Sequence, residues 1–343
     1  MIILGIDTSC DDTSAAVLAN GQRLLSNALN SQVKLHNPHG GVVPELASRE
    51  HLRNIMPVVQ AALLNAHIRM KDLDGIAVTV GPGLVGALLV GLYYAKGLAY
   101  ACGIPLLAVN HLEGHILSIF LEKEFPAFPF VALTVSGGHT NLYHVKNYCR
   151  YFQMGQTLDD AAGEAFDKVA KILGLGYPGG ILIEKLARDG RKDKINFPRA
   201  FLSNDSLDFS FSGLKTSVSL YIKKWHEKKV DKDVTLADIA ASFQESVVDV
   251  LVQKVLRAEE KIGAKRVMVA GGVACNNRLR TKLLEAASNK GIQVYFPRPE
   301  YCSDNGAMIA MAGHHRLLQG EKAPLSMDAR ARYPISDLSP ISF

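Results

Sequence analysis

The strongest constraint on the fold is an internal repeat. Residues 2–18 (IILGIDTSCDDTSAAVL) have the pattern of an apolar strand, a turn of short polar residues and a second strand, and residues 130–145 repeat it. Each half then contains a strand, a glycine turn and a helix, at residues 75–99 and at residues 266–287. One further strand and one further helix follow in each half. The repeat predicts two similar α/β lobes.

This plan is that of the actin-like ATPase and sugar-kinase architecture (ASKHA), in which two such lobes surround a cleft. With 343 residues, the chain is long enough for two domains of ordinary size. We expect residues 1–125 to form the first lobe, with the C-terminal segment 320–343 packing back on it. Residues 126–319 should form the second lobe, which carries an insertion.

The composition indicates a globular protein of the cytoplasm. Hydrophobic residues make up 48% of the chain and charged residues 21%, which describes a substantial core. The five cysteines form no C-x-x-C pair, which favours reduced thiols over disulfides or a zinc–thiolate finger. The N-terminus has no basic segment before Asp7, and hence no signal-peptide pattern. The most apolar run, residues 83–101, contains Lys96 and is expected to be a buried helix, not a membrane span.

Two histidines in NHLEGHILSIF (residues 110–120) are candidate metal ligands. Asn110 has the position of a helix N-cap, and on the helix that follows His111 and His115 share one face. Glu113 lies on the far side, so it cannot act beside a metal-bound water as the glutamate of an H-E-x-x-H zinc protease does. We expect Glu113 instead to complete a capping box with Asn110.

The repeat predicts a third ligand. The helix that opens near Ser303 has the place in the second half that the His111 helix has in the first, and it carries Asp304. Because ligands collect at the carboxyl ends of strands in α/β sheets, the two helix starts should face each other across the cleft. His111, His115 and Asp304 would then form a two-histidine, one-carboxylate site with open positions. Local sequence alone favours Asp304 as a helix N-cap, but the repeat reverses this preference.

Glycine and hydroxyl loops in the second half suit a nucleotide. The amides and serine hydroxyl of residues 136–140 (SGGHT) can hold an anion, although the same pattern occurs in plain hairpin turns. Asp167 lies in a predicted helix, where aspartate is unfavourable, and it could accept hydrogen bonds from ribose hydroxyls or face solvent. Turns at residues 176–180 and 270–277 allow close approach of a flat ligand or phosphate. No dinucleotide or Walker fingerprint accompanies them.

Two other motifs have no chemical interpretation at this level. DFSFSGLKT (residues 208–216) alternates like an edge strand. NPHGGVVPELASREH (residues 37–51) combines basic, histidine and glycine residues in a loop that could contact phosphates or be plain surface.

Taken together, the motifs resemble the bacterial TsaD family. GIDTSCDDTS, NPHGGVVPELASREH, GPGLVGALLVG, NHLEGH, VSGGHT, DDAAGEAFDKVAKILGLGYPGG, DFSFSGLKT, AGGVACNNRLR and CSDNGAMIA stand in order between residue 2 and about residue 334. The resemblance implies an enzyme that transfers a threonylcarbamoyl group from threonylcarbamoyl-AMP to tRNA. The acceptor would be N6 of the adenosine beside the anticodon, in tRNAs that read codons starting with A. The family was formerly described as a glycoprotease.

The resemblance also implies site residues. One metal ion, Fe(2+) or else Zn(2+), would be bound by His111, His115 and Asp304. The threonylcarbamoyl-adenylate would be bound by Thr134, Val135, Ser136, Gly137, Gly138, Asp167, Gly180 and Asn276. Asp11 matches a family aspartate important for activity. Asp7 and Asp12 stand where many relatives have glutamate, so Asp11 is preferred to Asp12 as the catalytic contributor.

The implied partners are tRNA, a non-catalytic TsaB-like paralogue as heterodimer partner and a TsaE-like P-loop ATPase, with no membrane. A net charge of +5 is too small to hold tRNA tightly unless basic residues are concentrated. The candidates for phosphate contact are Lys34, His36, His39, Arg49, Arg278 and Arg280.

Three other functions stay open at this stage. A metalloendopeptidase is suggested by the two histidines and the old family name, but the position of Glu113 counts against it. An actin-like ATPase or kinase is suggested by the repeat, but no P-loop supports it. A non-catalytic scaffold would lack metal ligands, and all three are present in this sequence.

Overall fold

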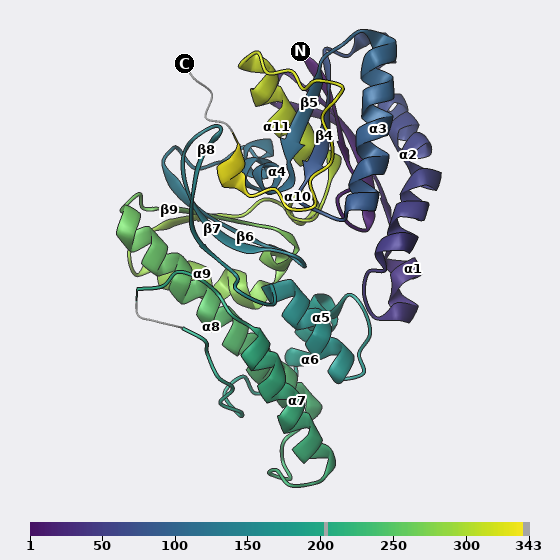
Figure 1. Ribbon diagram of the computed structural model, residues 1–343. Coiled ribbons are helices and arrows are strands. Elements are labelled where there is room, and N and C mark those ends of the chain that lie inside the picture. The colour runs from purple at the N-terminus through teal and green to yellow at the C-terminus, as the bar shows by residue number, and fades with distance from the viewer. Residues whose placement is uncertain (202–204, 339–343) are drawn as a thin grey trace. The chain divides into compact units, whose positions relative to one another are not determined.

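A computed structural model describes residues 1–201 and 205–338, which form two compact units (Figure 1). Unit 1 contains Met1–Phe125, Asn147–Tyr151 and the C-terminal segment from Pro297 onward. Unit 2 contains Pro126–Lys146 and Phe152–Phe296.

The sheet of unit 1 has the strand order β3-β2-β1-β4-β5. β1 (Ile2–Asp7) pairs antiparallel with β2 (Asp12–Ala19), as the turn of short polar residues after β1 predicts, and β3 (Arg23–Ser31) extends the pair to an antiparallel meander. β4 (Gly75–Gly81) and β5 (Leu106–Asn110) continue the sheet parallel to β1. The carboxyl ends of β1, β4 and β5 therefore share one edge, which is where α/β sheets bind ligands.

Helices cover both faces of this sheet. Side chains alternate along β1, so Leu4 and Ile6 join the core formed with α2 (Pro44–Ala66) and α3 (Val85–Cys102), whereas Gly5 faces α11 (Gly306–Leu318). The shorter helices are α1 (Val33–His36), η1 (Asn37–His39), η2 (Met70–Asp72), α4 (His111–Leu117), η3 (Ser118–Leu121), α10 (Pro299–Cys302) and η5 (Ile335–Asp337).

Among the described residues, α3 is the one helix that is long and apolar enough to cross a membrane. It packs against β4 and α2, and Lys96 on its buried side donates a hydrogen bond to the carbonyl of Met327. The prediction of a buried helix is confirmed.

Unit 2 repeats the plan of unit 1 with the strand order β10-β9-β6-β7-β8. β6 pairs antiparallel with β7 and parallel with β9, and β9 pairs parallel with β10, as their counterparts do in unit 1. The predicted duplication of an α/β plan is confirmed. The strands are β6 (Phe130–Val135), β7 (Thr140–Asn147), β8 (Arg150–Gln156), β9 (Arg266–Ala270) and β10 (Gln293–Tyr295). The helices are α5 (Ala162–Ile172), α6 (Gly179–Ala187), α7 (Ser212–His226), α8 (Leu236–Ile262), η4 (Gly272–Cys275) and α9 (Asn277–Ser288).

The last helix departs from the repeat. α11 follows β10 in sequence but packs on β1, β2 and β4, so the chain returns to unit 1 at Pro297, earlier than residue 320. Two glycines allow this packing. A Cβ atom on Gly5 would lie 2.3 Å from the Gly306 carbonyl oxygen, and one on Gly306 would lie 2.6 Å from the Ala16 nitrogen. The first turn of α11 therefore rests backbone to backbone on the sheet.

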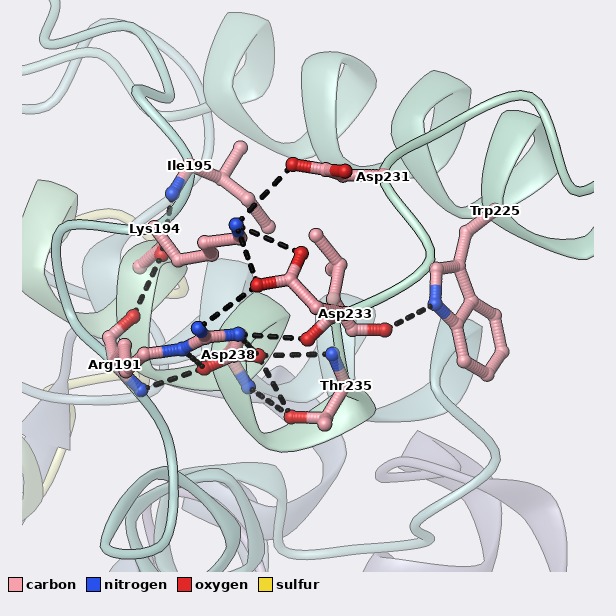
Figure 2. Close-up of polar contacts among 10 residues, drawn as sticks. Arg191, Lys194, Ile195, Trp225, Asp231, Asp233, Thr235 and Asp238 are labelled. Atoms are coloured by element: carbon pink, nitrogen blue, oxygen red, sulfur yellow. Dashed lines mark hydrogen bonds and ion pairs between the residues drawn. The ribbon is translucent and has the colours of Figure 1, made fainter.

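A charge network holds the start of α8 in unit 2 (Figure 2). Arg191 donates to both carboxylate oxygens of Asp238, at 2.9 Å from Nε and 2.8 Å from Nη2, and also pairs with Asp233. Asp238 completes a capping box with Thr235. These hydrogen bonds, that from Arg191 above all, hold the pKa of Asp238 well below its usual range.

We expect Asp238→Asn to lower the free energy of unfolding by about 1–3 kcal/mol at pH 7, because charge-assisted bonds to a buried group are lost. A depressed folded-state pKa stabilises the protein above the unfolded pKa of about 3.9. The difference in free energy of unfolding between wild type and Asp238→Asn should thus be complete above about pH 5 and shrink as pH falls below about 4. Denaturant titrations across this range measure it.

Asp231→Asn is the control, since the Asp231 side chain is 74% exposed and pairs with Lys194 alone among the described residues. Its effect should stay under about 0.5 kcal/mol. If the difference in free energy of unfolding between wild type and Asp238→Asn did not change with pH, the depressed pKa of Asp238 would be contradicted.

Candidate functional site

The polar end of β5 starts α4 without an intervening loop. Asn110 is the N-cap, as predicted, because its Oδ1 accepts hydrogen bonds from the backbone nitrogens of Leu112 (2.9 Å) and Glu113 (3.4 Å). Its Nδ2 donates to the Tyr333 carbonyl at 2.8 Å, which ties the cap to the C-terminal segment. His111 is therefore the first helical residue at the carboxyl edge of the sheet.

His111, His115 and Asp304 come together in unit 1. The two imidazole centroids lie 4.7 Å apart with an interplanar angle of 80°. Oδ1 of Asp304 lies 3.4 Å from His111 Nε2 and 3.2 Å from His115 Nε2, and one ligand atom from each residue falls within 4.8 Å of the others. Both histidines are buried.

This cluster fits one metal ion. Ligand atoms of a tetrahedral site with bonds of about 2.0–2.1 Å lie roughly 3.3–3.4 Å apart, close to the observed separations from Asp304. Neither ring nitrogen of the buried His115 has a hydrogen-bond partner in the described part of the chain. Such an arrangement is unfavourable unless a ligand satisfies the nitrogen that faces the cluster. The three residues are thus a candidate metal site.

Asp304 reaches the histidines through close helix packing. Asn305, not Asp304, caps α11 by accepting from the Met308 nitrogen at 3.0 Å, so the N-cap alternative for Asp304 is wrong. Gly114 of α4 faces α11, and a Cβ there would lie 3.0 Å from Ile309 Cδ1. The prediction that α4 and α11 belong to opposite lobes is also wrong, since both are in unit 1.

A buried carboxylate stands behind His111. Oδ1 of Asp7 lies 3.5 Å from His111 Nδ1 and accepts from Thr79 Oγ1 at 2.5 Å. Burial lowers the pKa of His111, but Asp304 and Asp7 outweigh it and raise that pKa to about 10. The pocket thus favours positive charge, and Asp7 is placed to orient a ligating imidazole. Sequence reasoning did not assign Asp7 to this role, and its only signal was its position at the end of a parallel strand.

Glu113 is not part of a capping box, so that prediction is wrong. Its fully buried carboxylate accepts from Arg316 at 2.7 and 2.9 Å and from the Tyr151 hydroxyl at 3.1 Å. It thereby joins α4 to α11 and to Tyr151, which belongs to unit 1. The prediction that Glu113 points away from the histidines agrees with these contacts, since its partners are not those of the metal cluster.

The β1–β2 turn carries further carboxylates next to the cluster. Burial raises the pKa of Asp12 to about 7; the hydrogen bond from Ser31 opposes this rise, and the charges of Asp11, Asp304 and Asp7 add to it. Asp11 is partly exposed on the same turn. An acid with a pKa near 7 can exchange a proton at physiological pH.

In unit 2, the loop after β6 is tied to α5. Ser136 closes the loop with His139 through hydrogen bonds of 2.8 and 3.2 Å. The Ser136 carbonyl accepts from the Gly163 nitrogen at 3.2 Å. Gly137 and Gly138 are exposed, with no heavy atom within 4 Å of a Cβ built on either, so their backbone is open to a ligand. Thr134 and Val135 are buried at the end of β6.

Asp167 and Asn276 position helix starts. Oδ1 of Asp167 accepts from the Gly179 nitrogen at 2.7 Å, which links α5 to the first turn of α6, where Gly180 is sterically open. Asn276 caps α9 and donates to Gln244 Oε1 at 2.8 Å. Hydrogen bonds therefore connect the Ser136 loop, α5 and the start of α6, while Asn276 is anchored on α8.

A cavity of about 290 Å³ lies between α6, α8 and α9. Glu184 lines it and accepts from the Asn277 backbone nitrogen at 3.1 Å and from Asn277 Nδ2 at 2.6 Å. Gln244 and Arg278 also line it. Sequence reasoning did not assign Glu184 a role, and its position one helical turn after Gly180 was the available signal.

One further prediction is corrected, and the candidate tRNA contacts can be placed in the structure. DFSFSGLKT is not an edge strand, because Asp159 accepts from Ser210 Oγ, from the Phe211 nitrogen and from Ser212 Oγ and so caps α7 at Ser212. Three proposed tRNA contacts are engaged within the protein: His36 is buried against Gln32, Arg278 pairs with Glu245, and Arg280 bonds the Ala274 carbonyl. Lys34, His39 and Arg49 are exposed, and Arg49 also pairs with Glu45.

Two α/β units with the same strand order define an actin-like ATPase fold, and solved structures share it. Component A of (R)-2-hydroxyglutaryl-CoA dehydratase from Acidaminococcus fermentans aligns with a TM-score of 0.54 and 17% identity, over 93% of this chain and 99% of that one. Full-length HypF in its phosphate- and nucleotide-bound form aligns with a TM-score of 0.60 and 14% identity, over 92% of this chain and 55% of that one. These likenesses establish the fold.

The chain belongs to the TsaD family, whose model, described as tRNA N6-adenosine threonylcarbamoyltransferase, matches residues 23–311. The enzyme of that name from Thermodesulfovibrio yellowstonii is 54% identical over 336 residues, which are 98% of this chain and 100% of the relative. That from Syntrophus aciditrophicus is 50% identical over 335 residues, 98% of each chain. The family resemblance is confirmed.

His115→Ala or Asp304→Ala should lower metal affinity by more than about 100-fold, because a direct ligand is lost. Asp7→Asn should lower it by roughly 10–100-fold, the effect usual for a residue that orients a ligand. Metal analysis after reconstitution with ferrous or zinc ion, followed by chelator competition, measures the series. His226→Ala, exposed at the end of α7, is the control. Equal affinities across the series would refute a site at this cluster.

Glu113→Gln should lower the free energy of unfolding by about 3 kcal/mol, because Arg316 loses the fully buried half of its ion pairing. Glu321→Gln removes the more exposed partner of Arg316 and should cost under about 1 kcal/mol. Bound metal should be unchanged in both variants, as measured by metal analysis beside denaturant unfolding. Loss of metal at unchanged stability in Glu113→Gln would place Glu113 at the metal site.

Proposed function

We propose that this protein transfers the threonylcarbamoyl group of threonylcarbamoyl-AMP to N6 of the adenosine adjacent to the anticodon, in tRNAs that read codons starting with A. Family membership supports the reaction, since the relatives are named for tRNA N6-adenosine threonylcarbamoyl transfer. The observation that carries the proposal is the cluster of His111, His115 and Asp304, whose spacing fits one ion.

The chemistry does not require a nucleophilic side chain. A mixed carbamic–phosphoric anhydride already has an activated carbonyl and a good leaving group, so the enzyme must position two substrates and stabilise negative charge. Burial and Asp11 raise the pKa of the Cys10 thiol, the cysteine in the β1–β2 turn, well above its usual value, which keeps it protonated and unreactive.

The metal would be Fe(2+), with Zn(2+) as the alternative, held by His111, His115 and Asp304. When bound, the ion would supply positive charge that can bind a carboxylate or phosphate oxygen and polarise a carbonyl. Asp7 would orient His111. Asp11 would accept the proton of the attacking amine, and Asp12, with its pKa near 7, offers a second acceptor on the same turn.

The adenylate would bind unit 2. The open backbone at Gly137 and Gly138 suits the phosphate, and the Ser136 loop is fixed by its bonds to α5. The nucleoside would lie toward the cavity lined by Glu184 and Gln244. The full set proposed to bind the adenylate is Thr134, Val135, Ser136, Gly137, Gly138, Asp167, Gly180 and Asn276.

We also propose that the protein works in the cytoplasm with a TsaB-like paralogue as heterodimer partner and a TsaE-like P-loop ATPase. Family membership supports tRNA as the substrate. A metalloendopeptidase is disfavoured, because Glu113 is locked in an ion pair with Arg316 and cannot activate water at the metal cluster. An ATPase or kinase activity would be recognised by ATP turnover in the isolated protein.

Reconstitution with threonine, bicarbonate, ATP, the enzyme that makes the adenylate and tRNA, with and without the paralogue, should yield N6-threonylcarbamoyladenosine by mass spectrometry. Asp11→Asn should lower kcat on the order of 10²–10⁴-fold, the usual contribution of a general base, with adenylate affinity and bound metal unchanged. Asp328→Asn, an exposed aspartate of unit 1, is the control. Absence of the modified nucleoside with wild-type protein and all components would reject the proposed function.

A further inference from the structure

A histidine occupies an apolar position in the core of unit 1. The buried face of α2 consists of Ala47, His51, Ile55, Val58, Val59, Ala62 and Leu63, all apolar except His51. The His51 side chain is fully buried. Burying an imidazole is unfavourable unless its nitrogens are hydrogen-bonded, so the contacts of this ring must account for its presence.

Both ring nitrogens of His51 are used, and one tautomer fits. Nε2 lies 3.0 Å from the Cys10 carbonyl oxygen, and Nδ1 lies 2.7 Å from Thr13 Oγ1. A carbonyl only accepts, so Nε2 carries the hydrogen and donates to Cys10. Burial lowers the pKa of His51, which keeps the ring neutral, so Nδ1 accepts from the Thr13 hydroxyl.

The Cys10 carbonyl is the middle of three consecutive carbonyls that are each held by a different segment. The Ser9 carbonyl accepts from the Leu84 nitrogen at 2.9 Å, and the Asp11 carbonyl accepts from the Gln32 nitrogen at 3.1 Å. The outer two donors are backbone groups, whereas the donor to Cys10 is the His51 side chain. His51 is therefore the side chain that holds the middle carbonyl of the β1–β2 turn, between two backbone anchors.

The turn that His51 holds carries Asp11 and leads directly into Asp12. Asp304, one of the candidate metal ligands, is close enough to both Cys10 and Asp12 to affect their ionisation. His51 itself hydrogen-bonds the turn through the Cys10 carbonyl and the Thr13 hydroxyl. A shift of the Cys10 carbonyl would move the Asp11 carboxylate relative to the metal cluster, and displacements of about 1 Å can lower rates by about 10²-fold.

We infer that His51 is a positioning residue for threonylcarbamoyl transfer, which sets the location of the Asp11 carboxylate through its Nε2–H bond to the Cys10 carbonyl. This rests on the proposed function. It also gives a role to the end of the NPHGGVVPELASREH motif, which has none in the metal or adenylate sites.

Two isosteric substitutions separate the two contacts of the ring. The amide nitrogen of His51→Gln reaches the position of Nε2 and can donate to Cys10, whereas the shorter amide of His51→Asn reaches only the position of Nδ1, near Thr13. We expect kcat to fall 10–100-fold in His51→Asn and less than about threefold in His51→Gln. The KM for the adenylate and the bound metal should be unchanged in both.

Ile55→Ala is the matched control for stability, because Ile55 lies one helical turn further along the same buried face of α2 and belongs to the apolar core. It should destabilise the protein while keeping kcat. Wild-type kcat in His51→Asn, or equal losses in His51→Asn and His51→Gln, would overturn the inference. The inference would also be overturned if kcat fell in proportion to the free energy of unfolding in both Ile55→Ala and His51→Asn.

A readout without turnover distinguishes this inference from the proposed function. Nitrogen-15 NMR of histidine-labelled full-length protein should show His51 as the neutral Nε2–H tautomer, with its signal assigned by loss in His51→Gln. A Nδ1–H tautomer or a charged ring would overturn the inference even if the enzyme makes the modified nucleoside. The expected tautomer in a protein that forms no modified nucleoside would leave the hydrogen bond established and reject the catalytic function.

Discussion

The contact on which the candidate metal site depends is the packing of α11 onto β1 and β2 at the level of the backbone. Gly5 and Gly306 have no side chains to hold the helix away, so the start of α11 lies against the sheet. Asp304 precedes that first turn and is thereby brought to the carboxyl edge where α4 begins. Further along α11, Arg316 pairs with Glu113 on the far side of α4. This ion pair fixes the rotation of α4 about its axis, so that the histidines face Asp304. One close helix–sheet contact and one buried ion pair thus align ligands that are almost 200 residues apart in sequence.

In the proposed function the two units divide the chemistry, with the candidate metal site in unit 1 and the proposed adenylate site in unit 2. Unit 1 contains the metal cluster, Asp7 and the turn with Asp11, all near the carboxyl ends of β1, β4 and β5. Unit 2 contains the open Ser136 loop, Asp167 and the cavity beside Glu184. The same strand plan serves both units, but the polar residues at the strand ends differ, so the two units would have different roles in the proposed function.

Sequence reasoning identified the elements whose signals are local. The hairpin at residues 2–18, the N-cap Asn110 and the apolar helix around Lys96 each follow from the order of polar and apolar residues, because hydrogen bonding and burial act there over a few positions. It failed where a partner comes from far away. Glu113 at N3 suits a capping box, yet Arg316 and Tyr151 form stronger contacts with it. Likewise, the DFSFSG stretch looks like a strand until Asp159 caps it as the start of α7.

By itself the sequence determined that there are two α/β units, which family the chain belongs to, and which histidines share a helix face. These properties depend on residue order and periodicity, which are present in the unfolded chain. The repeat and the family resemblance also predict Asp304 beside the histidines, as the structure has it. Only the tertiary structure decided that Asn305 caps α11, that Asp7 stands behind His111, and that His51 holds the Cys10 carbonyl. Each of these needs two distant segments to pack at a particular separation and rotation. That geometry results from the whole core and from where glycine allows close approach, and no local pattern encodes it.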